Sequence, residues 1–263
     1  AKARHVALAE VAGPVPPRKL VVADLEFGRD LLTLRMDAEG KSKPESPSSL
    51  ETLMVSGLAW LLKRLEAEPI AWAPECTNPL LLGTLAHSVF EGLFQAGQAL
   101  PAREEIPARV EALLEEVLRH RAPFLRSSQW AVERRNFAAL TTRAALAWRE
   151  TLAQLEAEVV AAEAWLGGTW SGIAVHGQTD LILGLPGDRL LVVDYKRSKS
   201  TNRLKQMQKG FDSQASLYRA MIASGGPKDL DKRALAVRLR KAADTGVVYY
   251  LMNDQVALSD TLL

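Results

Sequence analysis

The chain contains the stretch Leu190-Leu191-Val192-Val193-Asp194-Tyr195-Lys196, in which four apolar residues directly precede an acidic, an aromatic and a basic side chain. An apolar run of this kind is typical of a strand buried on both faces, where an unpaired charge is costly. The preceding run from Ile173 to Leu183 is also β-prone, and the turn residues Leu185-Pro186-Gly187-Asp188 separate the two runs. Together they predict a β-hairpin whose second strand ends in charged residues.

The register of this hairpin follows from its turn. If residues 185 to 189 form the turn, Gly184 faces Leu190 and Asp180 comes opposite Asp194. Directly opposed side chains share a face, with their β-carbons about 4.5 to 5.5 Å apart. Lys196 follows Asp194 by two residues, so strand alternation returns it to the same face. A slip of one residue would instead separate the two carboxylates.

Two opposed carboxylates repel each other, whereas a hard divalent cation between them stabilises both ionised forms. Mg²⁺ prefers oxygen ligands and retains several waters, which suits hydrolysis of a phosphodiester. Lys196 would then orient or help to deprotonate the attacking water, or offset charge on the phosphate. A structural ion pair is the alternative, because Glu39-Gly40-Lys41 has the same spacing in what reads as a solvated loop.

The segment after this strand is basic, with no acidic residue from position 196 to position 209. The pattern predicts phosphate binding, with a solvated charged face as the alternative. Further on, Gln214 and Tyr218 are four residues apart and share a helix face, from which they could address substrate or Lys196, or pack in the core. The candidate nucleic-acid-binding residues are Arg197, Lys199, Arg203, Lys205 and Lys209.

The N-terminal part of the chain predicts an extension followed by helices. Residues 1–45 include Gly13-Pro14-Val15-Pro16-Pro17 and a polar stretch, which is typical of an extended arm or linker. Because the chain begins without Met, we also consider that it is a fragment of a longer protein. Residues 46–158 are expected to be mainly helical, with helices starting at Ser46, spanning about 80–96, and recurring between about 104 and 158.

Residues 159–263 predict the sheet-containing core. The β-prone run 159–166 is followed by Gly167-Gly168, which predicts the first hairpin turn. A helical stretch over about 204–223, a basic segment and a final β-prone run over 246–252 follow the second hairpin.

Composition narrows the class of protein. The 263 residues are 48% hydrophobic and 24% charged, which is ordinary for a soluble globular protein. The net charge of +2 neither requires nor excludes a nucleic-acid partner. No apolar run approaches the roughly 18 residues of a membrane span, so we expect no membrane partner. Cys76 is the single cysteine and cannot form an internal disulfide, which makes the cytoplasm the simplest compartment.

Several motifs, taken in order, resemble those of the PD-(D/E)xK nuclease superfamily, specifically its RecB-like and AddB-like branch. The resemblance covers about residues 46 to 252. The motifs are Ser46-Pro47-Ser48-Ser49-Leu50-Glu51, Gly83-Thr84-Leu85-Ala86-His87, Gly177-Gln178-Thr179-Asp180, Asp194-Tyr195-Lys196 and Gln214-Ala215-Ser216-Leu217-Tyr218.

The resemblance implies an α/β, restriction-endonuclease-like core: a mixed sheet of about four strands flanked by helices, with a large helical insertion. The nuclease domain would span 46–263. The resemblance further implies metal ligands at His87, Asp180 and Asp194, with Glu163 as a further acidic candidate. Lys196 would be the catalytic lysine, and Gln214 with Tyr218 would support the position of substrate or lysine.

The expected cofactor is Mg²⁺ or Mn²⁺. In some AddB-like members a Cys-Pro pair supplies one ligand of an iron–sulfur cluster, and the other cysteines lie near the end of the domain. Here Ser56-Gly57 stands at that place and Cys76 is the single cysteine, so we expect no cluster. The function implied is a metal-dependent DNA nuclease, an exonuclease of DNA repair or recombination, with DNA and a helicase region or subunit as partners. The alternative is a non-cleaving DNA-binding or scaffolding module, against which the complete motif set argues.

Overall fold

The computed structural model describes residues 33, 36–65, 77–209, 213–228 and 233–261. The chain divides into the units 1–33 and 34–263, and all the helices and strands described belong to the second unit. Most of the expected N-terminal extension, and Cys76, lie outside the described residues. The main elements are α1 (Pro47–Val55), α2 (Gly57–Arg64), α3 (Pro79–Leu93), α4 (Ile106–Arg121), α5 (Ala131–Gln154), β1 (Glu158–Trp170), β2 (Ile173–Leu185), β3 (Arg189–Lys196), α6 (Ser200–Gln208), α7 (Gln214–Ser224), β4 (Gly226–Pro227), α8 (Arg233–Lys241), β5 (Asp244–Leu251) and β6 (Val256–Ser259).

The described strands form one mixed six-stranded sheet in the order β4-β1-β2-β3-β5-β6. The expected antiparallel meander β1-β2-β3 is confirmed, and β5 pairs parallel to β3 after the helical crossover. The sheet has two strands more than predicted. Both are short edge strands, β4 against β1 and β6 against β5, and their pairing rather than a strong apolar pattern defines them.

The first hairpin turns later than predicted. Strand β1 continues through Gly167 and Gly168, and the turn is Ser171-Gly172, with φ of 48° and 79°. The glycine pair serves close packing instead: a β-carbon on Gly168 would lie 2.7 Å from the Met221 Cα of α7. The prediction of a turn at Gly167-Gly168 was therefore wrong, because glycine signals close backbone approach as well as turning.

The helices also differ in detail from the prediction. The apolar run after Ser46 is divided into α1 and α2 at Ser56, whose hydroxyl accepts a hydrogen bond from the Ala59 backbone and caps α2. The stretch predicted as one helix over 204–223 is two helices, α6 and α7. The basic segment forms α8. In the described part of the chain, no helix combines the length and the apolarity that crossing a bilayer requires.

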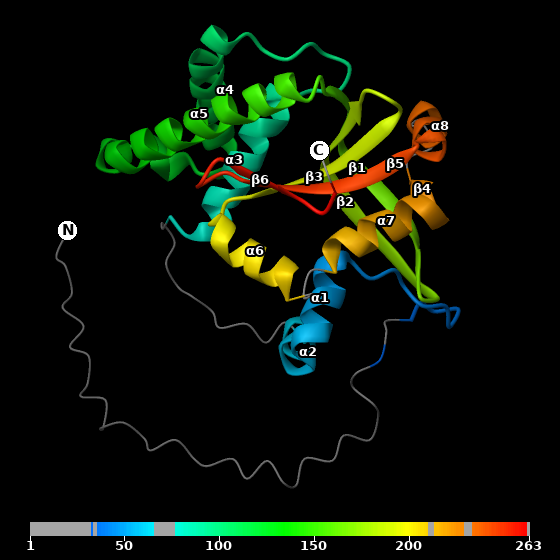
Figure 1. The fold of residues 1–263 in the computed structure, drawn as a ribbon. Coiled ribbons are helices and arrows are strands. Elements are labelled where there is room, and N and C mark those ends of the chain that lie inside the picture. Colours follow the sequence, from blue (N-terminus) through cyan, green and yellow to red (C-terminus); the bar gives the residue numbers. More distant parts are fainter. Residues whose placement is uncertain (1–32, 34–35, 66–76, 210–212, 229–232, 262–263) are drawn as a thin grey trace, which may run out of the picture. The chain divides into compact units, whose positions relative to one another are not determined.

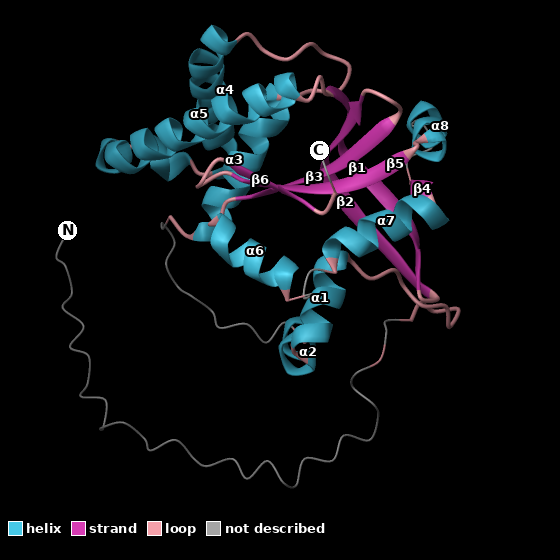
Figure 2. Cartoon of the chain, in the orientation of Figure 1, coloured by secondary structure: helices cyan, strands magenta, loops and turns pink. Residues whose placement is uncertain are grey.

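Helices cover both faces of the sheet (Figures 1 and 2), and a hydrophobic core lies on each face. Helices α3, α4 and α5 contribute to the first core, and α1, α7 and α8 to the second. Strand β3 supplies both in alternation: Leu191, Val193 and Tyr195 face the first core, whereas Leu190 and Val192 face the second. The charged end of β3 therefore lies between two layers of helices.

Candidate active site

The candidate site lies where strands β2 and β3 separate. Their pairing keeps the predicted register, Gly184 opposite Leu190, and ends at Leu181 opposite Val193. At the next position the Asp180 carboxylate accepts a hydrogen bond from the Tyr195 backbone N–H through Oδ2. A side chain thus replaces the strand carbonyl as the partner of this N–H, and it fixes the Asp180 carboxylate to the main chain of β3.

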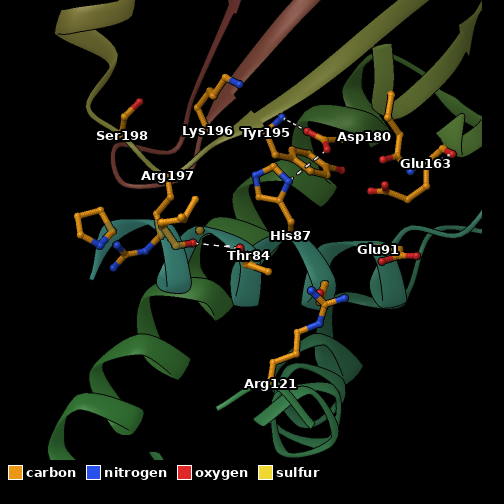
Figure 3. Close-up of a pocket in the computed structure, with 15 residues that line it drawn as sticks. Thr84, His87, Glu91, Arg121, Glu163, Asp180, Tyr195, Lys196, Arg197 and Ser198 are labelled. Carbon is orange, nitrogen blue, oxygen red and sulfur yellow. Dashed lines mark hydrogen bonds and ion pairs between the residues drawn. The ribbon is translucent and has the colours of Figure 1, made fainter. Parts of the chain in front are cut away.

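A cavity of about 790 Å³ opens beside this fork. Strand β2 contributes Asp180, β3 contributes Lys196, and helix α3 contributes His87 (Figure 3). Arg197 follows β3 and Arg121 ends α4, so guanidinium groups from two distant segments also line it. The first core, which packs α3 against the sheet, brings His87 to residues more than 90 positions away.

His87 contacts Asp180 directly, with Nδ1 3.2 Å from Oδ1. Helix α3 begins at Pro79, with the Asn78 side chain accepting from the Leu81 backbone as an N-cap. Burial lowers the pKa of His87, but the hydrogen bond to Asp180 and the negative charges of Asp180 and Asp194 outweigh it, so the pKa is raised above 6.5. The structure therefore joins His87 and Asp180, two of the three predicted metal ligands.

Asp194 and Lys196 form an ion pair, confirming that they share a face of β3. Asp194 Oδ2 lies 2.6 Å from Lys196 Nζ. Asp194 is only 6% exposed. Burial raises the pKa of its carboxyl even though the Lys196 ammonium lowers it. Burial therefore outweighs the Lys196 ammonium in its effect on the pKa of this carboxyl.

Gln214, at the start of α7, joins Asp194 to a buried arginine. Its amide donates to Asp194 Oδ1 at 3.3 Å and accepts from Arg203 Nη2 at 2.6 Å. Because both contacts are buried, Gln214 is a positioning residue in this structure. It holds one carboxylate oxygen and leaves the other toward Lys196.

Arg203 differs from the other residues of the basic run because it is 7% exposed. Its guanidinium lies 3.9 Å from the centre of the Tyr249 ring and 3.6 Å from Glu51 Oε1. The Arg203 guanidinium therefore interacts with residues of the protein interior. The prediction that Arg203 belongs to a phosphate-binding surface was wrong. Arg197 lines the cavity, whereas Lys199, Lys205 and Lys209 are exposed.

Tyr218 supports the site through the backbone of β2. Its hydroxyl donates to the Gln178 carbonyl at 2.9 Å, two residues before Asp180, and burial raises the pKa of the phenol far above its ordinary range. The expected contact with substrate or lysine is replaced by this bond to a carbonyl, so Tyr218 is also a positioning residue.

Glu163 reaches the cavity through an irregular backbone. The pairs that flank it, Ala162 with Leu181 and Ala164 with Thr179, place it level with Asp180. Its φ of 49° is left-handed, which is uncommon for a residue other than glycine. This kink turns the Glu163 side chain into the cavity wall next to Asp180 (Figure 3).

The donor chemistry of His87, Asp180 and Asp194 fits a hard divalent cation. Among the described residues, no three His, Cys, Asp or Glu side chains are already spaced as a metal-binding group. The reason is visible in the contacts, since Asp180 is held by His87 and Asp194 by Lys196. An ion bound by these carboxylates would therefore exchange these contacts for its own.

Sequence reasoning missed Arg121. This residue ends α4, inside the helical region, and it lines the cavity. No short motif surrounds it, so its role depends entirely on how α4 packs against α3. The structure brings it to the cavity although the sequence offers no local signal.

Comparison with known proteins agrees with this geometry. The model of the PD-(D/E)XK nuclease superfamily matches residues 44–262, which is most of the chain. A search of curated proteins returned no match. Members of this superfamily generally hydrolyse phosphodiester bonds with the help of divalent metal ions. Because the match extends over the whole sheet and its helices, the chain belongs to the PD-(D/E)XK nuclease superfamily.

Proposed function

We propose that this chain is a Mg²⁺-dependent deoxyribonuclease, with Mn²⁺ as a substitute, that acts as an exonuclease in DNA repair or recombination. The observation that carries the proposal is the convergence of His87, Asp180 and Lys196 on one cavity, with Asp194 paired to Lys196. Imidazole and carboxylate groups can hold a divalent ion, and an ammonium group can stabilise charge on a phosphodiester, so this combination from three separate elements suits metal-assisted hydrolysis.

In this proposal His87, Asp180 and Asp194 hold the ion, with Glu163 beside them. When bound, the ion would lower the pKa of water and neutralise charge on the phosphate. Lys196, released from Asp194, donates to the attacking water or to a phosphate oxygen and so holds the reactants in line. Arg197 and Arg121 attract the phosphodiester into the cavity from two sides.

Gln214 and Tyr218 act without touching substrate. Gln214 keeps Asp194 Oδ1 turned toward α7, so that Oδ2 is the oxygen available on the Lys196 side. Tyr218 holds β2 near Asp180. Glu91, one turn after His87 on α3, lines the cavity and would support the histidine.

The motif order supports the RecB-like and AddB-like branch, and with it a helicase region or partner subunit that feeds DNA to the site. A cytoplasmic location fits such a substrate. The domain boundary at about residue 46 and the absence of an iron–sulfur cluster remain predictions of the sequence.

A non-cleaving DNA-binding module is the second candidate, and the ion pair between Lys196 and Asp194 favours it. The deciding experiment incubates linear and circular DNA with Mg²⁺ and with chelator, using the unmodified chain and Lys196→Ala. We expect Mg²⁺-dependent loss of linear DNA that Lys196→Ala abolishes, while Lys241→Ala, an exposed lysine on α8, retains it. If the unmodified chain binds DNA and leaves both forms intact, the non-cleaving module is correct.

A further inference from the structure

An exposed aromatic residue adjoins the cavity along the sheet. Trp165 pairs with Gln178, and Gln178 lines the cavity. Its neighbours Ala164 and Leu166 belong to the second core, so Trp165 points to the opposite face, the one that carries His87. Trp165 lies two residues beyond Glu163 on β1, a spacing of about 6.6 Å along the strand.

Trp165 is 41% exposed. In the part of the chain that the structure describes, the other tryptophans are buried or only partly exposed. Within those same residues, the first core includes nothing of β1 beyond Ala162, so this end of the sheet face is left open to solvent. A large aromatic ring is kept at a surface where its burial would be favourable.

His176 packs against the Trp165 ring, and Lys228 extends the surface beside it. His176 packs edge-on against Trp165, with ring centroids 5.7 Å apart, and accepts from Lys228 Nζ through Nδ1 at 3.1 Å. Lys228 is exposed, and its backbone N–H donates to the Trp165 carbonyl at 2.9 Å. Its aliphatic chain lies over Gly167, where a β-carbon would come within 2.6 Å of Cε.

We propose that Trp165, His176, Gln178 and Lys228 form a platform that binds single-stranded DNA next to the cleavage site. One base stacks on the Trp165 ring, and Lys228 contacts the phosphate of a nucleotide beside it. This inference rests on the proposed nuclease function, because it identifies the kind of DNA that enters the cavity. It specifies the substrate as an unpaired strand.

The chemistry of the platform favours an unpaired strand over a duplex. A base can stack on a protein ring only when its own π-face is free, and in a duplex neighbouring base pairs cover that face. The platform is continuous with the cavity through Gln178, and an ammonium group at its edge complements a phosphate. The Trp165 ring therefore sets the position of the bound DNA strand relative to Asp180.

The test measures binding of a fluorescein-labelled oligothymidylate by anisotropy, with EDTA present so that cleavage does not interfere. We expect Trp165→Ala to weaken binding about 5- to 100-fold, and Trp165→Phe to retain most of it. Val132→Ala, which removes another exposed apolar side chain, should bind normally. Binding by Trp165→Ala within twofold of the unmodified chain would overturn the proposal, as would an equal loss for a blunt duplex.

The salt dependence separates the two contacts. Lys228→Ala should reduce the slope of log K against log salt by about 0.7, the value for one phosphate contact in a single strand. Trp165→Ala should lower K while leaving the slope unchanged, and Lys241→Ala should alter neither. An unchanged slope for Lys228→Ala would remove the phosphate contact from the proposal.

A small substrate distinguishes failure of the platform from failure of the nuclease. Bis(p-nitrophenyl) phosphate is a small phosphodiester with no base to stack, and Trp165 is not among the residues that line the cavity, so the unmodified chain and Trp165→Ala should hydrolyse it equally. If the unmodified chain hydrolyses neither this ester nor DNA, the nuclease proposal is wrong. If it hydrolyses both, and Trp165→Ala cleaves single-stranded DNA at the full rate, the platform alone is wrong.

Discussion

Gln214 links a buried cation, Arg203, to a buried carboxylate, Asp194, through two hydrogen bonds. Its amide lies between Arg203 and Asp194, and each contact uses a different end of the group. Residues that orient a ligand typically change metal affinity or activity by about 10- to 100-fold when removed. Gln214 should therefore act on the metal requirement more than on the rate at saturating metal.

We predict that Gln214→Ala raises the Mg²⁺ concentration for half-maximal cleavage by about 10- to 100-fold. The reason is that Asp194 Oδ1 loses its amide donor and the carboxylate can rotate. The measurement is a Mg²⁺ titration of the initial cleavage rate. Gln206→Ala is the matched control, since Gln206 also contacts Arg203, at 3.2 Å, but is exposed. An equal effect of both variants would contradict the assigned role.

His87 should make metal binding depend on pH. Burial lowers its pKa, but Asp180 and Asp194 together raise it above 6.5, so a proton competes with the metal in the neutral range. We expect Mg²⁺ affinity to rise between about pH 6 and pH 8, as measured by calorimetry. His87→Gln should flatten the rise and His120→Gln should not. A profile for the unmodified chain that falls over this range would refute the assignment.

The same titration has the opposite sign for the metal-free fold. A histidine with a raised pKa contributes stability that is fully present below its unfolded value, about 6.5, and is lost as pH rises through the folded value. Metal binding and the His87–Asp180 contact therefore favour opposite ends of the pH range.

At the scale of elements, Tyr218 fastens α7 to β2 near Asp180. We predict that Tyr218→Phe lowers the free energy of unfolding by about 1 kcal/mol, because the partly buried Gln178 carbonyl loses its donor. The variant should also need more Mg²⁺ for half-maximal cleavage. Urea unfolding and a Mg²⁺ titration measure the two effects. Tyr250→Phe removes a similar bond, to the Ala144 carbonyl, and should lower stability without shifting the Mg²⁺ requirement. A shift with both variants would make the effect nonspecific.

Local chemistry predicted the second hairpin well, because the turn residues and the apolar run determine which residues face each other. The confirmed register from Gly184–Leu190 to Leu181–Val193 is the result. The end of the β2–β3 pairing at Asp180 was not predictable from the sequence. There the Asp180 carboxylate, and not a strand carbonyl, accepts the hydrogen bond of the Tyr195 N–H. The left-handed Glu163 and the glycine pair in β1 likewise depend on packing against other elements.

At the scale of the whole molecule, binding of Mg²⁺ should raise the free energy of unfolding. We predict that Mg²⁺ at about 100 times its dissociation constant adds about 2.7 kcal/mol, which corresponds to about 5 to 10 °C in Tm. Differential scanning calorimetry measures this shift. Asp194→Asn should abolish it, whereas Asp188→Asn, in the β2–β3 turn with φ of 54°, should preserve it. A shift that survives Asp194→Asn would place the ion elsewhere.

The tertiary arrangement also explains which site residues sequence analysis found. His87, Asp180, Asp194 and Lys196 lie in motifs whose order could be recognised along the chain. Arg121 joins the cavity only through the packing of α4, and Arg203 leaves the basic surface only through Tyr249 and Gln214. Charge counting treats Arg203 and Lys205 alike, although one lies in the interior and the other in solvent.

The carboxylate that caps the main chain at Tyr195 has a consequence for recombining this domain with its relatives. Asp180 and the backbone N–H from which it accepts belong to opposite arms of one hairpin, so a crossover point between residues 180 and 195 that changes the length of the turn would move the N–H away from the acid. The segment from Ile173 to Lys196 contains both partners of this contact, so exchanging it as one piece keeps their spacing.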